Sequence, residues 1–186
     1  MLKSLITFLI GLILTSNAFA QPPEGKIALH ISRFHYEHPV RLLHPYLDFW
    51  HMKGPMAEKI SRESLKKNFN MLDDCNGDAN VLLLLEPHMF YNPQMRNFHA
   101  ELIVRVYANQ GPNPVITIKK QAQQEGDLAL TPEVHMEKAY LKAIQKIIKE
   151  LETDKTFLAS LKGLPIRDLQ SFCNGMYNWP LAKFYY

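Results

Sequence analysis

The sequence predicts an α/β fold of the α+β two-layer sandwich kind, in which helices pack on a mixed sheet of about four strands. Three patterns carry this prediction. Residues 81–87 (VLLLLEP) form a continuous apolar run with the length of a buried strand. Residues 97–109 alternate between apolar and polar side chains, as in a half-buried strand. From Met136 to Leu151, apolar residues recur every three or four positions, as on one face of a long helix.

The first 20 residues have the pattern of a signal peptide rather than of a folded element. Lys3 supplies the positive start, and the apolar run that follows (LITFLIGLIL) is too short to span a membrane. Small residues at the end of the segment predict cleavage between Ala20 and Gln21. An uncleaved anchor and a shifted cleavage site are the alternatives. We therefore expect residues 1–20 to be removed and residues 21–186 to form a single globular domain.

The composition is that of a globular protein, with 47% hydrophobic and 11% aromatic residues. Removal of the signal peptide takes away Lys3 and leaves a net charge of +2, which is too balanced to predict nucleic-acid binding. No later stretch reaches about 18 consecutive apolar residues, so no integral membrane segment is predicted in the mature chain.

The elements are expected in the order β-α-β-β-β-α. Residues 26–34 alternate and predict the first strand. Residues 35–54 are a histidine-rich insertion whose prolines exclude one continuous helix, although they are compatible with a short helical piece at 45–51. Residues 55–70 place apolar side chains on one helical face and predict the first helix, which a polar turn separates from the strand at 81–87.

The second half of the chain predicts a hairpin and a closing helix. Residues 97–109 and 115–123, joined by the turn NQGPNP, are expected to form an antiparallel pair. Pro132 suits the first position of the long helix. A short helix at 154–162 is followed by an aromatic C-terminal tail at 164–186.

Two cysteines, Cys75 and Cys173, lie in the part of the chain that would be exported. An even number of cysteines in an oxidising compartment favours a disulfide, with two buried free thiols as the alternative. Such a bond would close a loop of about 100 residues. It would tether the tail at 164–186 beside the turn that precedes the strand at 81–87.

The runs GDANVLLLLEP and HAELIVRVYANQGPNPVITIKKQAQ, followed by a long closing helix, resemble a group of bacterial envelope accessory domains. The group includes the N-terminal domain of the propeller protein of the Tol system, curli-secretion-type lipoproteins and the auxiliary lipoproteins of envelope ABC transporters. The resemblance covers residues 55–152 and rests on the order and pattern of the elements. It implies a non-enzymatic role at the cell envelope through protein–protein contacts, and it implies no functional residue. The chain departs from the group by lacking a lipidation cysteine and by adding the insertion at 35–54 and the tail at 164–186.

Five of the eight histidines fall within residues 30–51. Neutral imidazoles can bind zinc or copper, so the candidates for metal ligands are His35, His38, His44 and His51. Their spacing matches no closed ligand pattern. The alternatives are a loop whose histidines are exposed or hydrogen-bonded to the backbone, and a surface that gains charge as the pH falls from about 7 to 5.

The sequence predicts no catalytic residue and no cofactor. It contains no G-x-S-x-G, no H-E-x-x-H and no glycine-rich phosphate loop. Residues 74–80 look like the start of a calcium loop, but Ala79 stands where the loop needs glycine and Leu85 where it needs its final acid. Glu86 is expected to end its strand. A small hydrolase whose site is unrecognised is the remaining catalytic alternative.

Aromatic residues are the stronger candidates for a binding surface, because aromatic anchors dominate interface energetics. The candidates in the insertion and the tail are Tyr36, Tyr46, Phe49, Trp50, Tyr177 and Trp179. Alternatively, both segments cover the sheet and complete its core.

Together these patterns predict a periplasmic or secreted, non-catalytic accessory or binding protein of the bacterial cell envelope, with an envelope protein as its partner. The alternative is a periplasmic protein that binds zinc or copper through residues 35–51. The sequence carries no signal for a particular oligomeric state.

Overall fold

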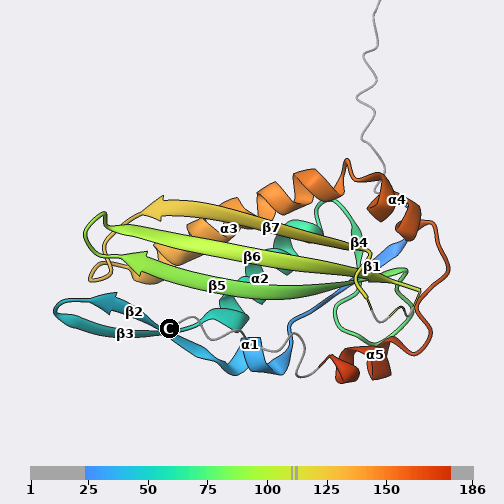
Figure 1. The fold of residues 1–186 in the computed structure, drawn as a ribbon, viewed down its shortest axis with the longest axis horizontal. Helices are drawn as coiled ribbons and strands as arrows, with labels where there is room; N and C mark the ends of the chain where they lie inside the picture. The colour runs from blue at the N-terminus through green and yellow to red at the C-terminus, as the bar shows by residue number, and fades with distance from the viewer. Residues whose placement is uncertain (1–23, 110, 112, 177–186) are drawn as a thin grey trace, which may run out of the picture.

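The computed structural model describes residues 24–109, 111 and 113–176, which form a sheet with helices packed against it (Figure 1). The elements along this part of the chain are β1 (Lys26–His30), α1 (Arg33–Glu37), β2 (Pro39–His44), β3 (Leu47–Met52), α2 (Lys53–Leu65), β4 (Asn70–Met71), β5 (Val81–Asn92), β6 (Asn97–Ala108), β7 (Ile116–Glu125), α3 (Pro132–Leu151), α4 (Lys155–Leu161) and α5 (Leu169–Gly175).

The main sheet has five strands in the order β4-β1-β5-β6-β7. β1 is parallel to both β4 and β5, whereas β5 is antiparallel to β6 and β6 to β7. This confirms the predicted α/β fold with a mixed sheet, and the antiparallel pairing of its last two strands. The additional strand, β4, has two residues and is too short to leave a periodic pattern in the sequence. Asn70 belongs to this strand rather than to the first helix, which ends at Leu65.

β5 continues past the end of the apolar run. The expected end at Pro87 is wrong, because the strand extends to Asn92. β1 pairs with β5 only as far as Leu84, so within the described residues no strand is paired with this side of β5 beyond that point. A residue without an N–H is tolerated at such a strand edge, which explains why a proline does not end the strand. Glu86 therefore lies inside a strand.

The histidine-rich insertion at 35–54 is regular structure, contrary to the prediction of a proline-broken insertion. The first strand ends at His30, and Phe34 belongs to α1 rather than to that strand. β2 and β3 then form a hairpin that is a two-stranded sheet of its own (Figure 1). The short helical piece that the prolines would allow at 45–51 does not form, since most of this range is β3.

The hairpin follows from an alternating pattern that its prolines obscure. Leu42 and His51 are buried on one side, whereas Leu43 and Trp50 are exposed on the other. One proline begins β2 and the next stands in the turn before β3, where a missing N–H is tolerated. The same prolines that exclude a helix are thus compatible with two short strands.

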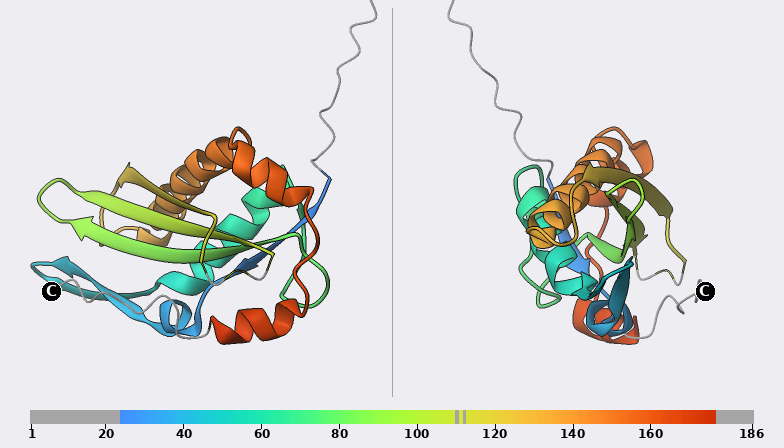
Figure 2. Two further views of the ribbon diagram at one scale, coloured as in Figure 1. Left: turned by 45° about the vertical axis from the view of Figure 1, so that its right-hand side comes forward. Right: turned by 90° about the vertical axis from the view of Figure 1, so that its left-hand side faces the viewer.

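Helices α2 and α3 lie on one side of the main sheet (Figure 2). They cover the main apolar core, to which β5 and β6 contribute the side chains of alternate positions. The large side chains buried there include Tyr91, Phe98, Tyr140 and Phe157. Full burial of a side chain of this kind stabilises the fold by roughly 2–3 kcal/mol. In the part of the chain that the structure describes, no helix combines the length and the apolar character needed to cross a membrane.

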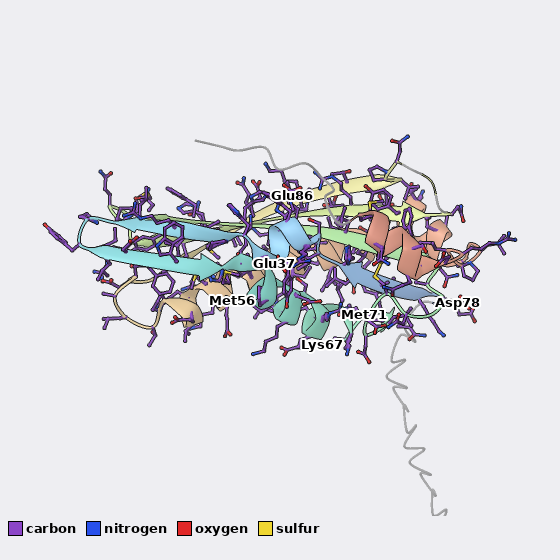
Figure 3. All side chains as sticks on the ribbon, turned by 90° about the horizontal axis from the view of Figure 1, so that it is seen from below. Glu37, Met56, Lys67, Met71, Asp78 and Glu86 are labelled. Atoms are coloured by element: carbon purple, nitrogen blue, oxygen red, sulfur yellow. A yellow bond between two sulfur atoms is a disulfide. The ribbon has the colours of Figure 1, made fainter. Side chains whose placement is uncertain are left out.

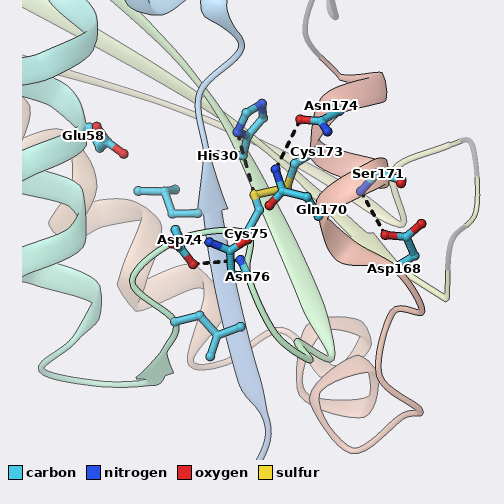
Figure 4. Close-up of a disulfide and its surroundings, with 12 residues drawn as sticks. His30, Glu58, Asp74, Cys75, Asn76, Asp168, Gln170, Ser171, Cys173 and Asn174 are labelled. Carbon is cyan, nitrogen blue, oxygen red and sulfur yellow. Dashed lines mark hydrogen bonds between the residues drawn. A yellow bond between two sulfur atoms is a disulfide. The ribbon is translucent and has the colours of Figure 1, made fainter.

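The opposite side of the main sheet, called the second face below, is covered at one end by α5. Phe172 packs edge-on against Tyr107, with ring centroids 5.7 Å apart, and Leu82 belongs to the same small core. A disulfide between Cys75 and Cys173 holds α5 in this place, with 6.5 Å between the two Cα atoms (Figure 4). The disulfide predicted from the sequence is therefore present.

Candidate functional site

The structure places the four candidate histidine ligands in different environments. His35 in α1 and His51 in β3 are buried, and the ring of His51 lies 6.1 Å from that of Tyr140 in α3. His38 is exposed after α1, and His44 is half-buried at the end of β2. Among the described residues, these four side chains do not converge on a common position for a metal ion.

One group of three potential ligands converges in the described part of the chain, and it lies elsewhere. The ligand atoms of His30, Cys75 and Cys173 are within 4.8 Å of one another. His30 Nδ1 is 3.9 Å from Cys75 Sγ (Figure 4). The two sulfurs are bonded to each other, so neither is a thiolate that could bind a metal ion. The two cysteines attach α5 covalently to the turn before β5, and His30 lies beside this bond.

A cluster of titratable side chains surrounds Glu86 of β5. This Glu86 cluster consists of Glu86 and His88 in β5, Arg105 in β6, His35 in α1 and Lys53 at the start of α2. Arg105 donates a hydrogen bond to Glu86 Oε2 at 2.6 Å, and His88 Nε2 lies 2.8 Å from Glu86 Oε1. His35 Nε2 is 3.9 Å from the same oxygen. Figure 3 marks Glu86 among the side chains of the described residues. Glu86 itself is only 9% exposed, so its charge is balanced by protein groups rather than by water.

Burial and neighbouring charges set the protonation states in the Glu86 cluster. Burial lowers the pKa of His35 from 6.5 to about 4, and the charge of Lys53 adds to this shift while Glu86 opposes it. Burial also lowers the pKa of Lys53, again against the effect of Glu86. For Glu86, burial acts to raise the pKa, but the hydrogen bonds from His88 and Arg105 outweigh it and lower the pKa to about 2. At neutral pH, His35 is therefore neutral and Glu86 is ionised.

This geometry makes Glu86 a fixed counter-ion. Both of its oxygens are engaged by neighbouring side chains, so it is not a free base. Neither ring nitrogen of His35 has a hydrogen-bond partner among the described residues. The sequence offered one signal for the cluster, a charge placed directly after the apolar run of β5. The contribution of His88 becomes visible only once β5 is known to pass beyond Pro87.

Large apolar side chains are exposed on the β2–β3 hairpin. This hairpin patch consists of Leu43, Trp50 and Met52 on the outer side, Tyr46 in the turn, and Leu47 at the start of β3, which lies on the side of His51. Tyr46 is 90% exposed and Trp50 is 58% exposed, so both side chains are accessible, and their role in binding stays a prediction. Tyr36 and Phe49 are half-buried and pack against the main core instead. Tyr177 and Trp179 lie outside the described residues.

A hollow of about 820 Å³ lies over the half of the second face that is farther from α5. The residues that line it include His88, Phe90, His99, Glu101 and Gln121. Phe90 is 55% exposed there. Both polar and apolar side chains line the hollow, so this half of the sheet has an amphipathic surface.

No protein-family model matches the sequence, and no curated protein matches it. Solved structures with a similar arrangement include a protein of the DUF330 family model from Xanthomonas campestris, at 10% identity and a TM-score of 0.47, covering 83% of this chain and 92% of that one. A minor lipoprotein from Acinetobacter baumannii is 13% identical, with a TM-score of 0.43, covering 68% and 91% of the two chains. The rare lipoprotein B from Shewanella oneidensis is 14% identical, with a TM-score of 0.34, covering 72% and 98%.

Two of these three proteins are lipoproteins by their descriptions. The TM-scores lie below 0.5, so the likeness carries no argument about this chain. The specific envelope families that the sequence pattern resembles stay a prediction.

Proposed function

We propose that this protein is a non-catalytic, exported accessory or binding component of the bacterial cell envelope that acts through protein–protein contacts. The observation that carries the proposal is the hairpin patch. Single exposed apolar residues are common on protein surfaces, but a group of them on one short hairpin is typical of an interaction site. Tyrosine and tryptophan are the residues that most often supply binding energy at such sites.

The hairpin is held in a defined position, which favours binding. Leu42 and His51 anchor its inner side to the protein interior, and β3 leads directly into α2. At the start of α2, a side chain on Gly54 would approach the Tyr36 Cα atom to 2.3 Å, so the backbones of α1 and α2 are in close contact there. A surface that is ordered before it binds loses less conformational entropy on binding.

Two features support the exported location. The pattern of residues 1–20 is that of a signal peptide. The disulfide between Cys75 and Cys173 closes a long loop, and such bonds persist in oxidising compartments. Both features fit a periplasmic or secreted protein whose partner is an envelope protein.

Photo-crosslinking in cells tests the proposed contact. The photoreactive residue p-benzoylphenylalanine at position 46 is expected to capture an envelope protein, because the Tyr46 side chain protrudes from the hairpin. The matched control carries the same residue at Val134, which is exposed on α3. Capture of no protein from position 46, or of the same proteins from both positions, would contradict the proposal.

A substitution measures how much the patch contributes. Trp50→Ala is expected to weaken the affinity for the captured partner by at least about fivefold, since truncation of an interface tryptophan commonly costs more than 1 kcal/mol. Val134→Ala serves as the control and is expected to leave the affinity unchanged. Equal affinities of the Trp50→Ala variant and the original protein would place the contact elsewhere.

A further inference from the structure

The open half of the second face exposes apolar surface that the rest of the described chain does not cover. α5 covers the half near Leu82 and Tyr107, whereas Phe90 is exposed and Ile103 is half-buried on the other half. Glu86 and Phe90 are an even number of positions apart in β5, so their side chains lie on the same face of the sheet. Ile103 is directly opposite Glu86 in β6 and therefore shares that face. An apolar surface of this kind gains stability when another apolar group covers it.

α5 directs the chain toward this open half. Before the helix, Ile166 donates a backbone hydrogen bond to Ala79, so the chain approaches the second face near the start of β5. At the other end of the helix, Asn174 lines a hollow together with Tyr36 of α1. α5 thus runs from the start of β5 toward α1 (Figures 1 and 2). The chain leaves the described part at Met176, which is buried on the second face.

The ten residues after Met176 have the length and composition to cover the open half. An extended segment of ten residues reaches about 33 Å. The part of β5 from Glu86 to Asn92 spans roughly 20 Å. Lys183 is the single charged side chain in the segment. Its larger apolar and aromatic residues are Tyr177, Trp179, Leu181, Phe184, Tyr185 and Tyr186.

We propose that residues 177–186 lie along the open half of the second face, with their aromatic side chains against Phe90 and Ile103. The disulfide between Cys75 and Cys173 holds the start of this segment beside its binding surface. Because the start of the segment is held near this surface, the effective concentration of the segment there is on the order of millimolar. Modest contacts are therefore sufficient to keep the segment on the surface. The tail thereby completes the fold, while the hairpin patch remains available for a partner.

Photo-crosslinking of the purified full chain tests this proposal. With p-benzoylphenylalanine in place of Phe90, we expect a crosslink to residues 177–186 of the same chain, at the mass of a monomer. The matched control carries the photoreactive residue at Val134 of α3 and is expected to give no crosslink to the tail. A crosslink from position 90 to a second copy only, or none to the tail, would overturn the proposal. Because this experiment probes position 90 of an isolated protein, its failure is distinct from a failure of position 46 to capture a partner in cells.

Removal of the tail provides a second measurement. Deletion of residues 177–186 is expected to increase the fluorescence of the apolar dye ANS severalfold, because Phe90 and Ile103 become accessible. The additional substitution Phe90→Ser in the truncated chain is expected to reverse part of this increase. A truncated protein that folds, as judged by circular dichroism, and binds no more dye than the full chain would overturn the proposal. Should truncation prevent folding, the crosslink from position 90 still decides it.

Discussion

At the scale of single residues, the Glu86 cluster shows how a buried carboxylate remains ionised. Arg105 and His88 donate hydrogen bonds to its two oxygens, and the resulting stabilisation exceeds the cost of burial. His35 is buried beside it without a partner for either ring nitrogen among the described residues, so it remains neutral. The cluster therefore places a neutral imidazole of α1 beside an ionised carboxylate of β5, and each group affects the pKa of the other.

Replacement of the carboxylate tests this balance. Glu86→Gln is expected to reduce the free energy of unfolding by about 3 kcal/mol, because Arg105 would be left beside a neutral group in a buried site. Glu101→Gln is the control, since Glu101 pairs with the exposed Lys119, and we expect a loss below about 1 kcal/mol. Urea unfolding monitored by circular dichroism measures both values. Equal losses in the two variants would contradict the structural role given to Glu86.

The buried histidines predict how stability depends on pH. Burial, followed by the charge of Lys53, lowers the pKa of both His35 and His51 from 6.5 to about 4, so the unfolded chain binds more protons than the folded protein between these values. The contribution of the two neutral histidines to the free energy of unfolding is complete above pH 6.5. It is lost as the pH falls toward 4, by up to about 3 kcal/mol for each histidine. His51→Phe is expected to make the free energy of unfolding fall less steeply as the pH is lowered, as measured by urea unfolding at successive pH values. Val134→Ala, which removes no titrating group, should leave the slope unchanged, and an unchanged slope in His51→Phe would refute the assignment.

At the scale of elements, the packing of α1 against α2 depends on the absence of a side chain. A Cβ atom at position 54 would lie 2.3 Å from the Cα atom and 2.5 Å from the carbonyl oxygen of Tyr36. These are backbone atoms, so relief requires one element to move away from the other. Because β3 runs directly into α2, such a movement would also displace the base of the hairpin.

A pair of glycine substitutions measures this contact. Gly54→Ala is expected to destabilise the protein by about 2 kcal/mol or more, since overpacking of a tight contact commonly has that cost. Gly175→Ala, also in a helix, meets no atom within 4 Å and is expected to be neutral or stabilising by up to about 1 kcal/mol. Thermal and urea unfolding of both variants compare the two effects. A Gly54→Ala protein as stable as the original would show that α1 can shift freely.

At the scale of the whole molecule, the disulfide connects distant parts of the chain. It joins the turn before β5 to α5 over a sequence separation of 98 residues, and it secures the cover of the second face. The main core does not depend on this bond, because α2, α3 and the sheet pack together on the opposite side. Its loss is therefore expected to release α5 first and to leave the main core assembled.

The double variant Cys75→Ser/Cys173→Ser tests the contribution of the bond. We expect a loss of roughly 4–5 kcal/mol in the free energy of unfolding, because the bond restricts the unfolded chain over a loop of about 100 residues. Addition of a reductant should lower the stability of the original protein to that of the variant, without affecting the variant. Two free thiols in a thiol assay of denatured, unreduced protein would show that the bond does not form.

The sequence by itself determined the class of fold, the central strands, the long helix α3 and the pairing of the two cysteines. These features leave local signals: an apolar run, alternation with period two, a helical apolar stripe, and an even cysteine count. The tertiary structure decided the rest. Residues 39–52 form a hairpin whose inner side chains, Leu42 and His51, are buried. Glu86 is an interior ion because β1 stops pairing with β5 at Leu84 and the His35 side chain of α1 lies beside the carboxylate. Periodicity records which side of an element is apolar, but what covers that side is set by contacts between segments far apart in the chain.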